Sequence, residues 1–212
     1  MLKEDIYIIG AGTYGETMHE LANILGYNVK GFYDEDKSKI DTFIMDTKVL
    51  GKFSELPTNK IKNKNFIVAI GNNEIRFEIM RKINKLEGET PTLIHPTAII
   101  SPSVKIGIGV YVQANAYLWT KVSIGNFCII SPGVVIAHHS KIGEACLISS
   151  NSTIGASINI NEKVFVGMGS TVVTGLSNIG GNSIIGAGAV VLKNTDENSV
   201  YAGIPAKKIR SI

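Results

Sequence analysis

The sequence has little of what marks secreted, membrane or nucleic-acid-binding proteins. Its 212 residues include only two cysteines, too few for a secreted disulfide framework. No apolar run approaches the roughly 18 residues of a membrane span, and IYIIG near the N-terminus is too short for a signal-peptide core. The formal net charge is only +3, without charged blocks, which disfavours nucleic-acid or membrane-surface partners. We therefore expect a cytoplasmic protein that binds neither nucleic acid nor membrane.

The first 90 or so residues alternate between two kinds of periodicity. Short apolar stretches at 6–10, 28–34 and 65–71 predict strands, and residues 16–25 and 74–87 have the spacing of amphipathic helices. Strands that alternate with helices predict a small parallel sheet covered by helices. We therefore expect the chain to begin with a small α/β domain of Rossmann-like character.

A period of six residues begins near residue 98. Steps of six from Ile100 meet an aliphatic residue every time as far as Val172, and after one extra residue the series resumes at Ile179. Glycine often follows directly, as at Gly125 and Gly143, where we expect a turn whose unusual dihedral angles suit glycine. This hexapeptide repeat predicts a parallel β-helix in which three hexads form one coil and residues 18 apart stack. The expected domains are 1–92 (α/β) and 93–212 (β-helix).

The two cysteines fit this repeat. Cys128 and Cys146 are 18 residues apart, so they should stack on neighbouring coils inside the prism. A strand spacing of about 4.8 Å would permit a disulfide. In a reducing compartment, however, buried free thiols are the expected state.

Three segments together resemble a known family. They are the glycine-rich start of the chain, IHPTA at 94–98, and a C-terminal part that reads GAGAVV followed by AGIPAKKI. Over nearly its full length the chain resembles the NeuD/PglD-like sugar acyltransferases. The resemblance implies a left-handed β-helix, a homotrimer with active sites between subunits, and acetyl-CoA as the acyl donor. It also implies a nucleotide-linked amino sugar as acceptor, such as a UDP- or dTDP-4-amino-4,6-dideoxy sugar or GDP-perosamine.

The glycine-rich loop lies between a predicted strand and a predicted helix. Glycines in a GxGxxG motif let the backbone approach a diphosphate at the helix N-terminus. Alone the motif suggests NAD, but fewer than 90 residues leave no room for the second half of a dinucleotide fold. The resemblance instead assigns the loop to the nucleotide of the sugar substrate, with acids after the second strand on its base or ribose. The assigned residues are Gly10, Gly12, Thr13, Tyr14, Gly15, Asp34, Glu35 and Asp36.

The end of the third predicted strand should lie at the same edge of the sheet. We place Gly71, Asn72, Asn73 and Arg76 near the nucleotide for that reason. The alternative is that these residues only form a turn and a helix cap.

Two adjacent histidines interrupt the repeat in VVIAHHSKIGE (134–144). His138 and His139 fall in a turn, so their side chains should project outward. Related trimers bind zinc through three histidines, but His19 and His95 lie outside the repeat core, and adjacent histidines rarely bind one ion together. We expect no metal. A histidine near neutrality can instead take a proton as a general base.

The family motif His-acid-x-x-IGE places the catalytic base at His138. The acid position after it is His139 in this chain, so Glu144 or a carboxylate from the next subunit could orient the base. Alternatively, His139 is itself the base, or the pair is only structural. A second family histidine, which faces the cofactor, is Leu147 here.

The resemblance also locates the coenzyme in a groove between two β-helices. A backbone N–H near Ala156 could hold the thioester carbonyl and the oxyanion. The tail from 202 to 210 would flank the adenine, where its cations could meet the 3′-phosphate, although it could equally be a solvated basic end. The residues assigned to the coenzyme are Leu147, Ala156, Met168, Gly186, Ala187, Ile204, Pro205 and Lys207.

The sequence thus predicts an N-acetyltransferase in which the sugar amine attacks acetyl-CoA directly and His138 takes the proton. Neither cysteine is placed to act as a nucleophile. Two alternatives are an O-acetyltransferase of a sialic-acid-like sugar, which needs stronger base assistance, and a non-catalytic nucleotide-sugar-binding scaffold.

Overall fold

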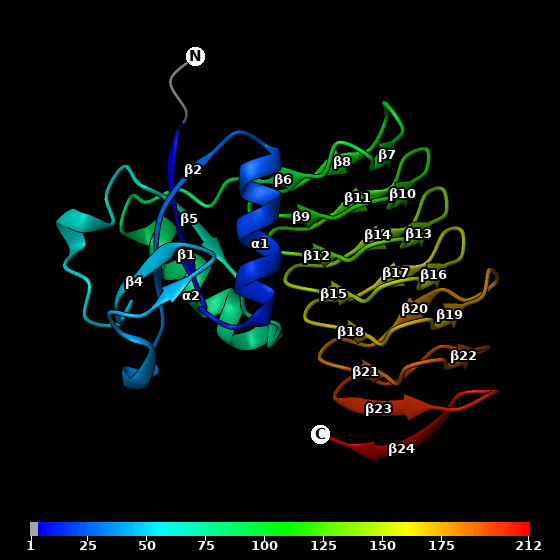
Figure 1. Cartoon of the computed structure of the whole chain (residues 1–212). Coiled ribbons are helices and arrows are strands. Elements are labelled where there is room, and N and C mark those ends of the chain that lie inside the picture. The colour runs from blue at the N-terminus through cyan, green and yellow to red at the C-terminus, as the bar shows by residue number, and fades with distance from the viewer. Residues whose placement is uncertain (1–3) are drawn as a thin grey trace. The chain divides into compact units, whose positions relative to one another are not determined.

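A computed structural model describes residues 4–212. The chain divides into two compact units, one that ends at Leu93 and one that runs from Ile94 to Ile212. Figure 1 draws the helices and strands of both, and each unit is described by itself below. No helix within residues 4–212 is long and apolar enough to cross a membrane.

The first unit is a five-stranded sheet with two α-helices. Its elements in chain order are β1 (Asp5–Ile9), α1 (Thr13–Ile24), β2 (Asn28–Tyr33), η1 (Lys37–Lys39), β3 (Phe43–Ile44), β4 (Thr47–Gly51), η2 (Thr58–Lys60), β5 (Asn65–Val68) and α2 (Asn73–Lys85). The strand order is β3-β4-β2-β1-β5, with β1 parallel to both β2 and β5 and only the β3–β4 hairpin antiparallel. α1 packs on β1 and β2, and α2 packs on β5.

These elements confirm the three predicted strands and two predicted helices and add two strands. The sequence of β4, TKVLG, has one buried residue, Val49, so no apolar run indicated a strand there. α1 begins three residues earlier than predicted and includes Gly15. A Cβ at Gly15 would lie 2.1 Å from the carbonyl oxygen of Gly10, so the missing side chain allows the helix to start tight against the loop.

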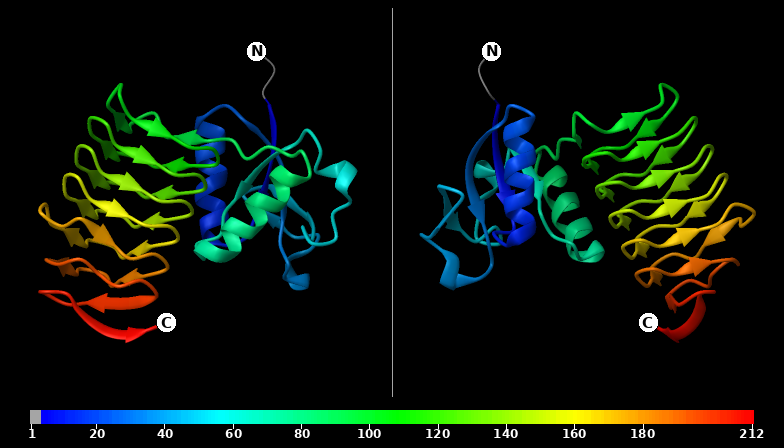
Figure 2. Two further views of the ribbon diagram at one scale, coloured as in Figure 1. Left: turned by 180° about the vertical axis from the view of Figure 1, so that it is seen from behind. Right: turned by 45° about the vertical axis from the view of Figure 1, so that its right-hand side comes forward.

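The second unit is a parallel β-helix, and each coil between residues 93 and 179 gives one short strand to each of three sheets. Figure 2 shows the coils stacked in sequence order. The six-stranded sheet contains β7 (Ile99–Ile100), β10 (Tyr117–Leu118), β13 (Val135–Ile136), β16 (Thr153–Ile154), β19 (Thr171–Val172) and β22 (Val190–Val191). The five-stranded sheet contains β8 (Lys105–Ile106), β11 (Ser123–Ile124), β14 (Lys141–Ile142), β17 (Asn159–Ile160) and β20 (Asn178–Ile179). The eight-stranded sheet contains β6 (Leu93–Ile94), β9 (Tyr111–Val112), β12 (Ile129–Ile130), β15 (Leu147–Ile148), β18 (Phe165–Val166), β21 (Ile184–Ile185), β23 (Ser199–Ala202) and β24 (Lys207–Ser211).

The interior of this β-helix is the aliphatic series that the six-residue period predicted. Its members pack in one buried cluster together with Cys128 and Cys146. Both cysteines are buried thiols outside any disulfide, as expected. Each thiol lies near a carbonyl oxygen of the next coil, Gly143 at 3.0 Å and Asn161 at 2.9 Å respectively.

The glycines that directly follow the aliphatic positions of the repeat are needed for a different reason from the one predicted. The backbone of Gly125 and Gly143 is not in the left-handed region; that conformation occurs two residues later, at Phe127 and Ala145. A Cβ on Gly143 would lie 2.6 Å from the carbonyl carbon of Asn161 on the next coil. Glycine is needed there because successive coils approach closely, so the dihedral explanation was wrong.

Candidate active site

The two adjacent histidines lie where the chain turns from the six-stranded sheet into the five-stranded sheet, between β13 and β14. The corresponding turns of successive coils stack along one edge of the prism. We call this edge the histidine corner, and it consists of residues 119–122, 137–140, 155–158, 173–177 and 192–194.

An open groove of about 740 Å³ follows the histidine corner. His138 is its lining residue from the 137–140 turn, and the others come from the three turns that follow. The groove is lined by His138, Ala156, Ser157, Thr174, Gly175, Leu176, Ser177, Leu192, Lys193 and Asn194. Of this set, only His138 and Ala156 were predicted from the sequence. The 18-residue stacking rule was the missed signal, because steps of 18 from His138 reach Ala156 and Thr174.

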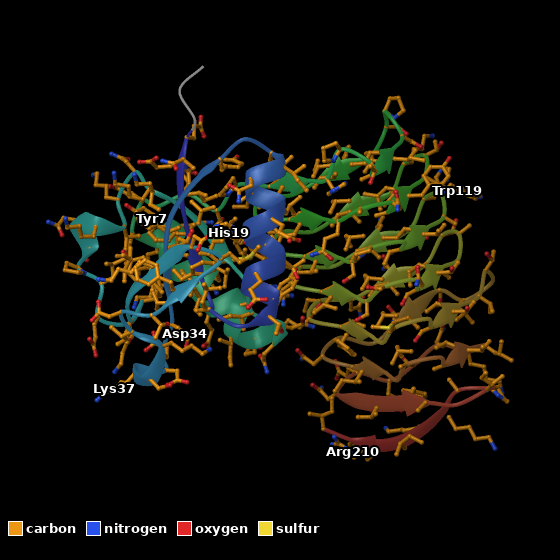
Figure 3. All side chains as sticks on the ribbon, viewed as in Figure 1. Tyr7, His19, Asp34, Lys37, Trp119 and Arg210 are labelled. Carbon is orange, nitrogen blue, oxygen red and sulfur yellow. The ribbon has the colours of Figure 1, made fainter. Side chains whose placement is uncertain are left out.

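The histidine side chains point out of the prism, as predicted, and both are exposed. Their Nδ1 atoms are 3.1 Å apart, and the rings meet edge to face with centroids separated by 5.2 Å. The His138 ring also lies 6.3 Å from that of Trp119, a residue that Figure 3 shows at the same edge of the β-helix. His139 has φ of 62°, the left-handed conformation that recurs in these turns.

Glu144 does not join this group within one chain. It lies at the next corner, between β14 and β15, and its Oε1 accepts a hydrogen bond from Asn126 Nδ2 at 3.2 Å. A single chain therefore does not supply Glu144 as the partner of His138, contrary to one of the two options for orienting the base.

Ala156 lines the groove, but its N–H is already used. It donates to Thr174 Oγ1 at 3.1 Å, so this N–H does not serve as an oxyanion donor in this arrangement. An oxyanion donor near Ala156 stays a prediction.

The other predicted coenzyme residues lie away from the histidine corner of the same chain. Leu147 is in β15, on the eight-stranded sheet. Met168, Gly186 and Ala187 lie in turns that lead from that sheet to the six-stranded one. One chain therefore does not bring these four residues together with His138.

The C-terminal tail folds into the β23–β24 hairpin. Ile204 and Lys207 are exposed, as is Pro205 between them. Lys208 donates to Asp196 Oδ2 at 2.9 Å; this hydrogen bond and the accompanying charge attraction lower the pKa of Asp196 and raise that of Lys208. Lys208 is therefore already paired, which leaves Lys207 as the better candidate for a phosphate contact.

The glycine-rich loop joins β1 to α1 in the first unit. Gly10 has φ of 102°, and a Cβ there would lie 2.8 Å from the Ala69 carbonyl oxygen, so only glycine fits the turn. At Gly12, the N-cap of α1, a Cβ would meet nothing within 4 Å, and no side chain caps the helix. The helix N-terminus thus opens onto space that an anion could occupy.

Asp34 at the end of β2 is the acid that reaches this loop (Figure 3). Its Oδ2 accepts the N–H of Ala11 at 2.8 Å and a hydrogen bond from Lys39 Nζ at 3.2 Å, and its Oδ1 accepts the N–H of Asp36 at 2.9 Å. Partial burial acts to raise the pKa of Asp34, but these hydrogen bonds together outweigh it and lower the pKa. The carboxylate is therefore ionised and fixed beside the loop.

Three other polar residues predicted near the nucleotide have local partners. Glu35 accepts hydrogen bonds from the N–H and hydroxyl of Ser54 at 2.9 and 2.7 Å. The side chains of Asp36 and Asn72 cap the helices that follow them, η1 and α2. For Asn72 this geometry fits the cap alternative, and the nucleotide contact stays a prediction.

Arg76 is fully buried and braces the loop that follows β5. Its guanidinium donates to the carbonyls of Ile70 and Gly71 at 3.1 and 3.2 Å and to Asn73 Oδ1 at 2.8 Å. Burial raises the pKa of Tyr14, and the nearby Arg76 charge opposes that rise. Arg76 thus holds the loop after β5 from within the protein, and its charge acts on Tyr14 in α1.

The two remaining histidines have structural partners. His19 is buried, with hydrogen-bonding contacts to Thr47 Oγ1 at 2.9 Å and Asn23 Nδ2 at 3.1 Å. His95 Nδ1 lies 2.9 Å from the hydroxyl of Thr97. Among the described residues, no group of three or more His, Cys, Asp or Glu side chains is arranged to hold a metal ion.

Comparisons with known proteins cover both units. Residues 5–83 match the PglD N-terminal domain, and residues 121–156 match the bacterial transferase hexapeptide (six repeats). Over 116 residues the chain is 30% identical to UDP-N-acetylbacillosamine N-acetyltransferase of Bacillus subtilis, a match that covers 52% of each protein. The chain spans about half, or less, of the length of the curated relatives that it matches.

Two solved structures match nearly the whole chain. PerB from Caulobacter crescentus, solved with CoA and GDP-perosamine, is 30% identical with a TM-score of 0.89 and covers 97% of each chain. The acetyltransferase domain of PglB from Neisseria gonorrhoeae is 27% identical with a TM-score of 0.87, covering 98% of this chain and 100% of that one.

The fold and these matches place the chain in the class of hexapeptide-repeat acyltransferases with a left-handed parallel β-helix behind an α/β domain. Within that class, the chain belongs to the NeuD/PglD-like sugar acyltransferase family. This confirms the resemblance and the fold class expected from the sequence.

Proposed function

We propose that this protein transfers an acetyl group from acetyl-CoA to the amino group of a nucleotide-linked amino sugar, with His138 as general base. The observation that carries the proposal is the open groove that includes His138. The likeness to PerB supports it, because that structure contains CoA and GDP-perosamine. Two variants of the Caulobacter crescentus enzyme in which one histidine is replaced also contain both ligands.

The groove suits the acyl donor. Small side chains at Ala156, Ser157 and Gly175 leave room for a thin pantetheine arm, and Lys193 places a cation in the same groove for a phosphate. His138 lines the groove too, so a thioester held there would lie near an imidazole. Acetyl-CoA supplies the acetyl group and leaves as the free thiol.

The glycine-rich loop suits the nucleotide of the acceptor. The open space at Gly12 and the helix N-terminus beyond it favour a diphosphate, and Asp34 is fixed alongside as a hydrogen-bond acceptor for a ribose hydroxyl. The name of the Bacillus subtilis relative supports an amino sugar as acceptor.

The chemistry asked of His138 is one proton transfer. As the amine nitrogen bonds to the thioester carbonyl carbon, it must lose a proton, and an unprotonated His138 Nε2 can take it. The new C–N bond replaces the C–S bond, and the coenzyme thiolate leaves and is reprotonated. Both buried cysteines lie inside the prism, so an acyl-enzyme on sulfur plays no part in the proposal.

We also propose a homotrimer. The predicted coenzyme residues Met168, Gly186 and Ala187 lie at a different corner from His138 in one chain. Two copies that pack side by side could bring these two kinds of corner to a shared groove. The active site would then need residues from neighbouring subunits.

The direct test is release of free thiol from acetyl-CoA with a panel of UDP-, dTDP- and GDP-linked 4-amino sugars. We expect release with one sugar and a loss of at least about 100-fold in kcat for His138→Ala, since a general base contributes about 10² to 10⁴. Lys163→Ala, in a turn at another corner, is the control. Acetylation of a sugar hydroxyl alone would favour the O-acetyltransferase alternative.

Failure has a distinct signature. If acetyl-CoA and the nucleotide sugars all raise the melting temperature, as ligands of the folded state must, but no thiol is released, the chain is a binding scaffold. If acetyl-CoA causes no stabilisation at all, the groove is not a coenzyme site.

A further inference from the structure

His139 stands where the family pattern has an acid, directly after the proposed base. The Nδ1 atoms of His138 and His139 are 3.1 Å apart, which is a hydrogen-bond distance. A neutral imidazole has one N–H donor and one acceptor nitrogen. One of the two Nδ1 atoms must therefore carry the proton, and the other must accept it.

The backbone on both sides of this contact is fixed by the neighbouring coils. The His139 N–H donates to the Thr120 carbonyl of the preceding coil, and the His138 carbonyl accepts from the Ser157 N–H of the following coil, both at 3.0 Å. His139 has a left-handed φ of 62°, and the Trp119 ring lies 6.3 Å from that of His138. The backbone that carries the pair is thus held by the stack of coils.

We propose that His139 is the positioning residue of the base: its Nδ1 accepts the Nδ1–H of His138 and so leaves the lone pair of His138 on Nε2. This rests on the proposed function. When His138 Nε2 takes the proton of the amine, the resulting cation still donates from Nδ1 to His139, now as a stronger, charge-assisted hydrogen bond. A neutral imidazole would thereby take the orienting place of a carboxylate.

The charged side chains on the turns and the strand next to the histidine pair are lysines. Lys121 lies on the turn above the pair, Lys141 begins the strand that follows, and Lys193 lines the groove. The turns 119–122, 137–140 and 155–158 contain no carboxylate. Protonation of both rings would place two Nδ1–H donors face to face in this setting, which like-charge repulsion opposes. A hydrogen bond between two Nδ1 atoms 3.1 Å apart therefore has one proton at the contact.

Two substitutions at residue 139 should remove or keep the hydrogen-bond acceptor without unfolding the protein, because this chain already has other residue types in the same left-handed turn position. Ala145 and Asn151 have φ of 56° and 58°, so His139→Ala and His139→Asn should fold. We expect His139→Ala to lower kcat about 10- to 100-fold, as loss of an orienting partner does, with KM for acetyl-CoA unchanged. His139→Asn, which keeps an acceptor, should stay within a few-fold of wild type.

The pH profile supplies a readout that a merely structural role would not move. In His139→Asp the carboxylate stabilises the charged imidazole, so the acid limb of kcat/KM should move to higher pH. Lys163→Ala, at a left-handed turn position with φ of 56° at another corner, should leave the pH profile unchanged. Wild-type kcat in His139→Ala, or an unmoved limb in His139→Asp, would overturn the proposal.

Nitrogen-15 NMR of the histidine rings tests the pairing without any sugar substrate. Wild type should show His138 protonated on Nδ1, and His139→Ala should show a mixture of both tautomers. If wild type acetylates no sugar, the proposed function fails, and this spectrum alone decides the pairing. The same mixture in wild type and variant would overturn it.

Discussion

At the scale of single residues, the polar side chains fall into two groups: those bonded inside the protein and those that face a groove. His19 and Arg76 are buried with their polar atoms engaged in the first unit. His138 instead projects from the prism into a groove. Buried polar groups must be satisfied within the protein, whereas an outward turn residue stays open to a ligand. Burial therefore separates His19 from the candidate base.

His19 gives a prediction for stability against pH. Burial lowers its pKa from the usual value of 6.5, and Glu20 only partly opposes this. Because the folded state favours the neutral ring, the unfolded state binds more protons below pH 6.5, so the free energy of unfolding should fall as pH decreases through that value. Urea unfolding at pH 8, 6.5 and 5 measures it.

The matched comparison is His19→Gln, which does not titrate. The variant should have a lower free energy of unfolding than wild type at pH 8, because it loses the stacking of the His19 ring on Phe32. The difference in unfolding free energy between the two proteins should become smaller towards pH 5. A constant gap would contradict the assignment. Asp34, whose pKa is lowered, contributes stability that is lost only as pH falls below its usual value of 3.8.

At the scale of elements, the repeat is built from two different turn positions. One requires glycine because the next coil touches it, as at Gly143. The other, two residues later, has positive φ but accepts side chains such as Ala145 and His139. The second position is therefore free to vary, and the histidine corner uses that freedom to place a functional side chain.

This difference predicts unequal costs for the same substitution. Gly143→Ala places a Cβ 2.6 Å from backbone and should cost about 3 kcal/mol, the upper end for overpacking. Gly169→Ala has φ of 66° but nothing within 4 Å, so it should cost about 1 kcal/mol, the conformational term alone. Denaturant unfolding of both variants checks the order, and equal losses would refute the close-approach explanation.

At the scale of the whole molecule, the two proposed ligand sites belong to different units. The glycine loop and Asp34 belong to the first unit, and the groove of the histidine corner belongs to the second. A ternary reaction needs both ligands at one centre. The proposed trimer meets that need by adding a second copy beside the open groove.

The trimer has a measurable consequence. Light scattering should give a mass of three chains of 22.8 kDa each, and dilution below the dissociation range should abolish acetyl transfer per chain while each β-helix stays folded by circular dichroism. Full activity from a monomer would contradict a shared active site. Acetyl transfer per chain that stays unchanged when the trimer dissociates would also contradict a shared active site.

Sequence patterns alone predicted a small α/β domain followed by a β-helix. The six-residue period predicted the interior of the β-helix, because every inward position must be apolar, and GxGxxG predicted the strand-loop-helix start. It also predicted that His138 projects outward. It did not predict β3 and β4, in which only Val49 is buried, so that no apolar pattern marks them.

Which polar groups form hydrogen bonds with each other depends on the folded structure. Sequence spacing could not show that the Ala156 N–H is used by Thr174, that Glu144 lies at another corner, or that Arg76 is turned inward. These are contacts between coils or between elements, and hydrogen-bond geometry depends on atoms that are distant in sequence. Periodicity fixes which way a residue faces, whereas the packing of neighbouring coils fixes what it touches.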